Sequence, residues 1–152
     1  MPDCIRKIEK MRVLFDVNVL IALLDENHIH HWRAHEWWAA NRSAGWATCA
    51  LTENGVTRIM SQSGYENPVS TAFAIDLLAE QVEHGDHVFW PDDISLRDPT
   101  HFVPTRILGP NQITDVYLLA LAVKNGGRLA TFDRTIPVAA VRRAEPRHLA
   151  VI

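Results

Sequence analysis

The chain has 152 residues, of which 47% are hydrophobic and 22% are charged, and its net charge is −3 at pH 7. This composition is typical of one soluble globular domain, and the length allows a sizeable buried core. The apolar runs are too short to span a bilayer, and the first ten residues contain no apolar segment of the kind found in secretory signals. The negative net charge does not by itself indicate a nucleic-acid partner.

Cysteine usage also bears on the cellular compartment. Cys4 and Cys49 are the only cysteines, and their spacing is not that of a metal site. Such sparse usage favours free thiols in a reducing compartment, with a single disulfide as the alternative. We therefore expect a cytoplasmic protein.

Short apolar runs alternate with helical patterns along the chain. The runs predict strands at 12–16, 45–49, 87–90, 128–132 and 148–152. The helical patterns predict helices at 18–24, 28–42, 50–62, 68–85 and 114–125. The last of these helices is apolar nearly all round and should be buried, whereas the proline-rich segment 91–112 should be irregular. Strands separated by helices predict a single α/β/α domain with a short, mostly parallel sheet.

Asp16 interrupts the most apolar run of the chain, VLFDVNVLIALL. A buried carboxylate without a partner costs on the order of several kcal/mol, so this position needs a physical reason. Asp133 directly follows another predicted strand, Asp115 lies in the first turn of the buried helix, and Glu53 lies one turn into the helix after the strand GWATC. Because sites in open parallel sheets form at the carboxyl ends of the strands, these four carboxylates are expected to converge.

Each acid also has a structural explanation when taken singly. Asp16 is a candidate cap for the helix that follows it. Asp115 is suited to the positive end of a helix, with Thr114 as the N-cap residue. Asp133 is a common type of turn residue, and Glu53 is compatible with a solvated helix surface.

Taken together, the four acids favour a metal site. Two carboxylates about 4 Å apart repel each other by about 4 kcal/mol at an effective dielectric constant of 20, so a cluster needs shared protons, basic side chains or a cation. Oxygen ligands without His or Cys suit Mg²⁺ or Mn²⁺, and such a site suits metal-assisted hydrolysis of phosphodiesters. Asn18 is close enough in sequence to support Asp16 or a metal-bound water.

The stretches VLFDVNVLIALL, ALTENG, ITDVYLLALA and TFD resemble, in this order, the four acidic motifs of PIN-domain nucleases, and more narrowly those of VapC-type toxins of bacterial toxin–antitoxin pairs. The resemblance begins near Met11 and runs to the C-terminus. It implies a PIN-like domain at 11–152 preceded by an N-terminal extension at 1–10. The tryptophan-rich stretch HIHHWRAHEWW also resembles its counterpart in these toxins.

The resemblance implies a Mg²⁺-dependent endoribonuclease in which the catalytic and metal-binding residues are Asp16, Glu53, Asp115 and Asp133. Asn18 and Thr131 are the expected supporting residues. The implied partners are RNA, a cognate antitoxin and a second copy of the chain, with no membrane involved. Arginines, including Arg134 beside Asp133, are available to hold phosphates despite the acidic net charge.

Two alternatives to this function remain open. A non-catalytic PIN-like module would bind RNA or protein through an incomplete site, and a phosphatase would use a similar acidic pocket. Cleavage of structured RNA, as against release of phosphate from small esters, separates them. The sequence does not name the RNA, because recognition of structured RNA depends on shape and loop contacts.

The segment 28–42 offers two further interpretations. His28, His31 and His35 share one side of the predicted helix with a spacing that can bind zinc, although a histidine face toward solvent or substrate is favoured. The tryptophans suit stacking on bases, but they more often belong to a core or an interface. We favour a dimer or partner interface for them.

Overall fold

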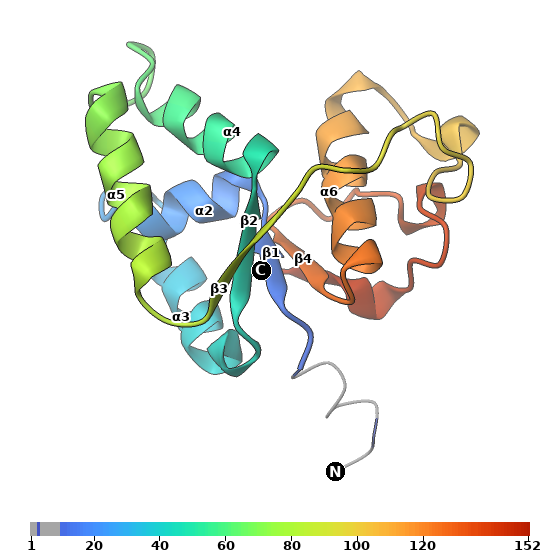
Figure 1. Ribbon diagram of the computed structural model, residues 1–152. Coiled ribbons are helices and arrows are strands. Elements are labelled where there is room, and N and C mark those ends of the chain that lie inside the picture. The colour runs from blue at the N-terminus through green and yellow to red at the C-terminus, as the bar shows by residue number, and fades with distance from the viewer. Residues whose placement is uncertain (1–2, 4–9) are drawn as a thin grey trace.

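The computed structural model describes residue 3 and residues 10–152 (Figure 1). The expected N-terminal extension at 1–10 therefore lies almost entirely outside the described residues, and the boundary at Met11 stays a prediction. Cys4 also lies outside them, whereas Cys49 is a free and buried cysteine. In the described part of the chain, every helix is too short or too polar to cross a membrane.

The described strands form one parallel sheet in the order β3-β2-β1-β4-β5. Their bounds are Val13–Phe15 for β1, Trp46–Cys49 for β2, His87–Trp90 for β3, Arg128–Thr131 for β4 and Leu149–Val151 for β5. All five predicted strands are confirmed; β3 has the predicted bounds, and the other four are slightly shorter than the apolar runs that predicted them. The parallel order places the ends of β1, β2 and β4 at the same edge of the sheet.

The five predicted helices are also confirmed. Their bounds are Val17–Leu24 for α2, His31–Asn41 for α3, Ala50–Met60 for α4, Thr71–Glu83 for α5 and Ile113–Lys124 for α6. They cover both faces of the sheet, with α6 on one side and α2 to α5 on the other (Figure 1). The domain is thus α/β/α, as predicted.

Several predicted helix starts differ from the structure; α3, for example, begins at His31 rather than at residue 28. Helix α5 begins at Thr71 rather than near Pro68, because the Ser70 hydroxyl accepts a hydrogen bond from the Phe73 amide at 3.0 Å and caps the helix there. Helix α6 begins at Ile113 with Gln112 at the N-cap position, so Thr114 lies inside the helix and does not cap it.

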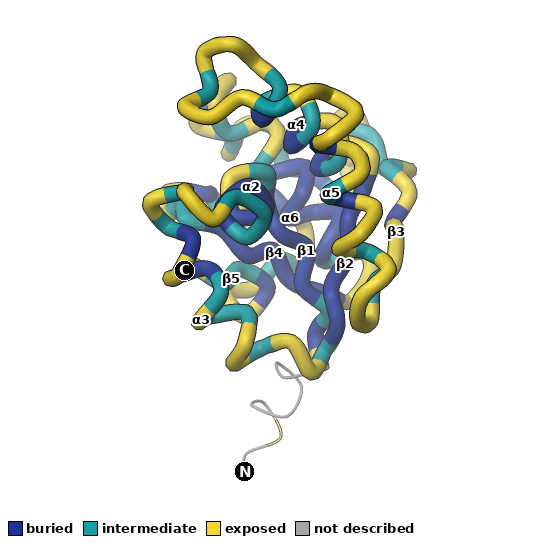
Figure 2. Tube along the Cα trace, turned by 90° about the vertical axis from the view of Figure 1, so that its left-hand side faces the viewer, coloured by how far each residue is buried: buried dark blue, intermediate teal, exposed yellow. Residues whose placement is uncertain are grey.

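The core lies on both faces of the sheet, which is buried along its centre (Figure 2). One cluster packs Leu14 and Leu129 against α6, whose residues from Val116 to Ala122 are all buried. The second cluster packs Val13 and Phe15 against the other four helices. This alternation of strand residues between two apolar clusters explains why the strands read as continuous hydrophobic runs.

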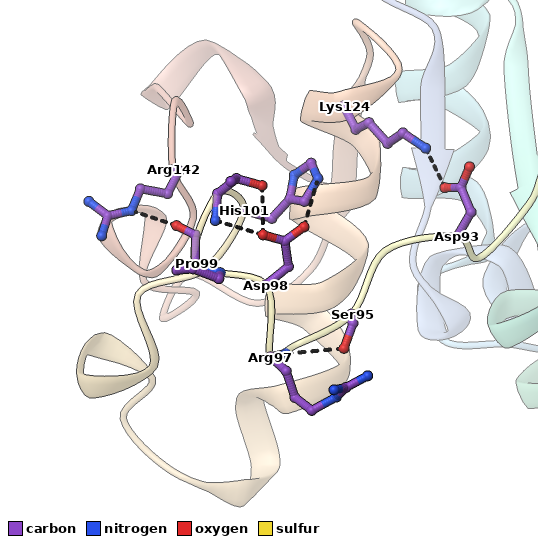
Figure 3. A network of polar contacts seen from close by, with 9 residues as sticks. Asp93, Ser95, Arg97, Asp98, Pro99, His101, Lys124 and Arg142 are labelled. Carbon is purple, nitrogen blue, oxygen red and sulfur yellow. Dashed lines mark hydrogen bonds and ion pairs between the residues drawn. The ribbon is translucent and has the colours of Figure 1, made fainter.

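The segment 91–112 is irregular, as predicted, but it is firmly attached to the rest of the domain. Phe102 is only 1% exposed and pairs with Val141 in an isolated antiparallel bridge. Figure 3 shows further attachments: Asp93 forms an ion pair with Lys124 of α6, and the Arg142 side chain donates to the Pro99 carbonyl at 3.2 Å. Apart from two short 3₁₀ helices at Pro104–Arg106 and Pro110–Gln112, the segment covers α6 without regular secondary structure.

Candidate active site

Asp16 lies directly after β1 and is the N-cap residue of α2. Its Oδ1 atom accepts a hydrogen bond from the Val19 amide at 2.8 Å, and its Oδ2 atom accepts one from the Thr131 hydroxyl. The side chain is buried, with the residue only 5% exposed. Burial raises the pKa of Asp16 and the charge of Asp133 adds to this effect, while the hydrogen bonds from Thr131 and Val19 act against it.

Thr131 connects two of the acidic positions. It is the last residue of β4 and is fully buried. Its hydroxyl donates to Asp16 and also accepts a hydrogen bond from the Asp133 amide at 3.0 Å. One hydroxyl group thus fixes the ends of two neighbouring strands relative to each other, and the supporting role expected for this residue in the site stays a prediction.

Asp133 follows β4 by two positions and begins a turn. Its Oδ1 atom accepts hydrogen bonds from the Thr135 amide at 2.7 Å and from the Thr135 hydroxyl at 2.6 Å. These two hydrogen bonds lower the pKa of Asp133. The turn explanation of this residue is therefore correct, and it does not compete with a role in the site, because the carboxylate stays charged beside Asp16.

Asp115 lies in the first turn of α6 and is partly buried. Burial, followed by the negative charges of Asp16 and Asp133, raises its pKa to about 6. No hydrogen bond from the described residues offsets this effect. The structure thus brings three of the four predicted carboxylates close enough to repel one another. No basic side chain of the described residues acts against the raised pKa values of Asp16 and Asp115.

Glu53 is oriented differently. It lies in the first turn of α4, and its Oε1 atom accepts a hydrogen bond from the Thr48 hydroxyl at 2.7 Å. The same hydroxyl lies 2.8 Å from Nε2 of His87 on β3. Glu53 also lines an open groove between α4 and α5 with Arg58 and Ile75. Its carboxylate is therefore held toward β2 and β3, and it is not a cause of the raised pKa values of Asp16 and Asp115.

The donor set is compatible with a hard divalent cation, although the cluster is not closed. Carboxylate oxygens are the ligands that Mg²⁺ and Mn²⁺ prefer, and the repulsion that raises the pKa of Asp115 is the effect a cation would relieve. In residues 3 and 10–152, however, no three His, Cys, Asp or Glu side chains are grouped closely enough to hold a metal ion. The metal-binding role of the four acids thus stays a prediction.

The remaining predicted residues lie at the surface. Asn18 is exposed in the first turn of α2, and only its backbone is involved in stabilising the Asp16 carboxylate. Arg134 is exposed directly after Asp133. Both positions are accessible to a ligand at this edge of the sheet. The supporting role of Asn18 and the phosphate contact of Arg134 stay predictions.

The histidines of segment 28–42 have structural roles that the sequence did not reveal. His31 is only 7% exposed, and its Nδ1 atom lies 2.7 Å from the Ala22 carbonyl. Nε2 of His35 lies 2.9 Å from the Leu23 carbonyl. The two rings therefore satisfy carbonyl groups in the last turn of α2, so His31 does not face solvent or substrate.

The tryptophans of this segment and the nearby Trp46 divide between core and surface. Trp37 and Trp38 pack edge-on against Phe15, with ring centroids 6.3 Å and 5.1 Å from its ring. Trp46, on β2, is buried. Trp32 is 75% exposed, and the interface expected for it stays a prediction.

Three polar residues near the acids were missed by the sequence analysis: Thr48, His87 and Thr135. Thr48 and His87 lie 39 positions apart in the sequence, and only the pairing of β2 with β3 brings them together. Thr135 carried a signal, because Asp133 followed two residues later by Thr is a common turn pattern.

Residues 13–142 match the family described as PIN domain, so the chain belongs to the PIN-domain family. Within that family it is a VapC-type protein. It is 47% identical over 142 residues to Ribonuclease VapC44 of Mycobacterium tuberculosis (strain ATCC 25618 / H37Rv), which covers 93% of this chain and 100% of the relative.

Two further relatives from the same strain support this assignment. Ribonuclease VapC39 is 42% identical over 127 residues, or 83% of this chain and 91% of the relative. Ribonuclease VapC29 is 38% identical over 123 residues, or 81% of this chain and 86% of the relative. The family resemblance inferred from the acidic motifs is thereby confirmed.

Proposed function

We propose that this protein is a metal-dependent endoribonuclease and the toxin component of a toxin–antitoxin pair, acting in the cytoplasm. The observation that carries the proposal is the convergence of Asp16, Asp115 and Asp133 at one edge of the sheet in a VapC-type chain. Three buried or partly buried carboxylates that form no ion pair with any Arg or Lys in the described part of the chain are costly to the fold, which is expected where they serve a ligand. The relatives VapC44 and VapC39 are named ribonucleases.

The residues proposed to hold Mg²⁺, or Mn²⁺ in its place, are Asp16, Glu53, Asp115 and Asp133. Such an ion, when bound, supplies positive charge to a scissile phosphodiester and lowers the pKa of water. Thr131 contributes by keeping the Asp16 carboxylate in one orientation. Arg134, next to Asp133, is proposed to contact phosphates of the RNA, and Asn18 is proposed to orient polar groups beside Asp16.

The proposed partners follow from the same site. A cognate antitoxin that controls an acidic pocket is expected to insert an Arg or Lys, since Arg binds carboxylates bidentately and keeps its charge. Inhibition by such a residue should weaken as Mg²⁺ rises, because both cations seek the same carboxylates. We also propose a homodimer, for which the exposed Trp32 is a candidate contact.

The test is cleavage of structured RNA by the purified protein with Mg²⁺ or Mn²⁺ and with EDTA. Asp16→Asn should abolish cleavage, and Asp76→Asn, which changes an exposed acid on α5, should leave it unchanged. The proposal is wrong if the wild-type protein cleaves no RNA with either metal, or if Asp16→Asn remains active.

A second candidate is a non-catalytic PIN-like module that binds RNA or protein. It is favoured by one observation, namely that the described residues contain no closed group of three metal ligands. RNA binding that persists in EDTA, without cleavage after metal is added, would support this candidate over the nuclease. Release of phosphate from small esters, without RNA cleavage, would instead indicate a phosphatase.

A further inference from the structure

We infer that His87 is a positioning residue that acts through Thr48 to hold the Glu53 carboxylate in a fixed orientation for cation binding. The inference rests on the metal site of the proposed function. It concerns residues that neither the acidic motifs nor the sequence analysis assigned to that site. Its basis is a chain of two hydrogen bonds across β2, β3 and α4.

The direction of these hydrogen bonds follows from the number of protons available. The Thr48 hydroxyl has one proton, and it donates to Oε1 of Glu53 at 2.7 Å, because a carboxylate can only accept. Nε2 of His87 lies 2.8 Å from the Thr48 hydroxyl oxygen. Because the hydroxyl proton is already used, Nε2 must donate to this oxygen. His87 thus carries a proton on Nε2, and the order is His87 Nε2–H to Thr48 Oγ–H to Glu53 Oε1.

Each member of this chain is held by its own surroundings. Thr48 is fully buried in β2, and the pairing of β2 with β3 sets His87 opposite Trp46, two residues before Thr48 on the same face. The ring centroids of His87 and Trp46 lie 4.5 Å apart with an interplanar angle of 63°. His87 therefore has one preferred ring orientation, with Nε2 toward the hydroxyl.

The backbone of Glu53 is fixed as well. The hydroxyl of the preceding Thr52 donates to the Cys49 carbonyl at 3.1 Å, and the Leu51 amide donates to Asp92 at 3.0 Å, so the first turn of α4 is secured on two sides. With Oε1 bound by Thr48, the second oxygen of Glu53 is the one left for a ligand. Outer hydrogen bonds of this type orient metal-binding carboxylates and commonly affect metal affinity.

The alternative is that His87 only packs against Trp46, and matched variants separate the two roles. His87→Phe keeps an aromatic ring against Trp46 but loses the donor, whereas His87→Gln keeps an N–H donor near the position of Nε2. Thr48→Val removes the hydroxyl with little change in shape, and Thr48→Ser keeps it. His84→Phe, at an exposed position three residues earlier, is the control for a surface aromatic.

The first measurement is Mn²⁺ binding by calorimetry without RNA. His87→Phe and Thr48→Val should each weaken binding about tenfold or more, while His87→Gln, Thr48→Ser and His84→Phe stay within about threefold of the wild-type protein. In a Glu53→Gln background, His87→Phe should have no further effect, because its influence passes through Glu53. Equal losses for His87→Phe and His87→Gln, or none for either, would overturn the inference.

The second measurement needs no metal. Nitrogen-15 NMR of the metal-free wild-type protein should show His87 with a proton on Nε2, and Thr48→Val should change the carboxyl carbon shift of Glu53. A neutral His87 with its proton on Nδ1 alone would refute the hydrogen-bond order. If the wild-type protein neither binds Mn²⁺ nor cleaves RNA, the proposed metal site fails, and this measurement still decides the position of the His87 proton.

Discussion

The Thr131 hydroxyl donates a hydrogen bond to the Asp16 carboxylate across 115 positions of sequence. Both residues are buried, and they stand at the carboxyl ends of adjacent strands. The contact explains how the fold tolerates an acid inside its most apolar run. Asp16 receives donors from Thr131 and from the first turn of α2, and these hydrogen bonds partly offset the cost of burial.

Replacing Thr131 by Val should destabilise the protein and impair the proposed cleavage. The change leaves a buried carboxylate oxygen without its donor, which costs about 1–3 kcal/mol. Thermal unfolding in EDTA measures the stability, and RNA cleavage with Mg²⁺ measures the activity. Thr131→Ser, which keeps the hydroxyl, should behave like the wild-type protein; equal behaviour of the Val and Ser variants would contradict the role given to this hydroxyl.

Two substitutions at Asp16 should separate its capping role from its proposed metal-binding role. Asn caps helices about as well as Asp, so Asp16→Asn should keep the free energy of unfolding in EDTA near that of the wild-type protein while cleavage is lost. Asp16→Ala should lose cleavage and also about 1 kcal/mol of stability, since the Val19 amide loses its acceptor. If Asp16→Asn were less stable than Asp16→Ala, the capping role assigned to Asp16 would be contradicted.

His31 should be needed for stability and not for catalysis. Its Nδ1 atom faces the Ala22 carbonyl, so the neutral ring must carry its proton there. His31→Ala removes this donor from a buried carbonyl, and we expect a loss of about 1–3 kcal/mol by denaturant unfolding. Mg²⁺-dependent cleavage measured well below the unfolding temperature should change little. If the wild-type protein retained zinc in the presence of a chelator and His31→Ala lost it, the purely structural role of His31 would be contradicted.

His148 should make folding stability depend on pH. Burial lowers its pKa below the ordinary value of 6.5, and the charge of Arg147 adds to this effect. Its Nδ1 atom accepts a hydrogen bond from the Glu145 amide at 2.9 Å, which protonation of that nitrogen would remove. The unfolded chain therefore binds more protons below pH 6.5, and stability should fall as the pH drops from 6.5 through the folded-state pKa.

The matched variant for this prediction is His148→Asn, which offers an oxygen acceptor to the Glu145 amide and does not titrate in this range. Urea unfolding between pH 7.5 and about 5 measures the dependence for both proteins. The difference in unfolding free energy between them should be constant above pH 6.5 and should shift in favour of the variant below it. A difference that is independent of pH would contradict the assigned cause.

The order and type of the secondary-structure elements were determined by the sequence alone. Strands such as Val13–Phe15 and Arg128–Thr131 are continuous apolar runs, and α6 is apolar on nearly every side, so local patterns were sufficient. The start of α5 was missed, because the Ser70 cap two residues after Pro68 competes with the proline for the first turn. Parallel topology then made the convergence of Asp16, Asp115 and Asp133 predictable, because strand ends share an edge.

Only the tertiary structure decided how the individual side chains are used. Glu53 accepts a hydrogen bond from the nearby Thr48, but the contact that completes this arrangement comes from His87 on β3. His87 follows Thr48 by 39 positions in the sequence, and the pairing of β2 with β3 brings the two together. The burial of His31 depends on the carbonyl groups at the end of α2, which no periodicity of segment 28–42 reveals. Hydrogen bonds such as these join residues distant in sequence, and their geometry follows from how helices and strands pack rather than from the local pattern that forms each element.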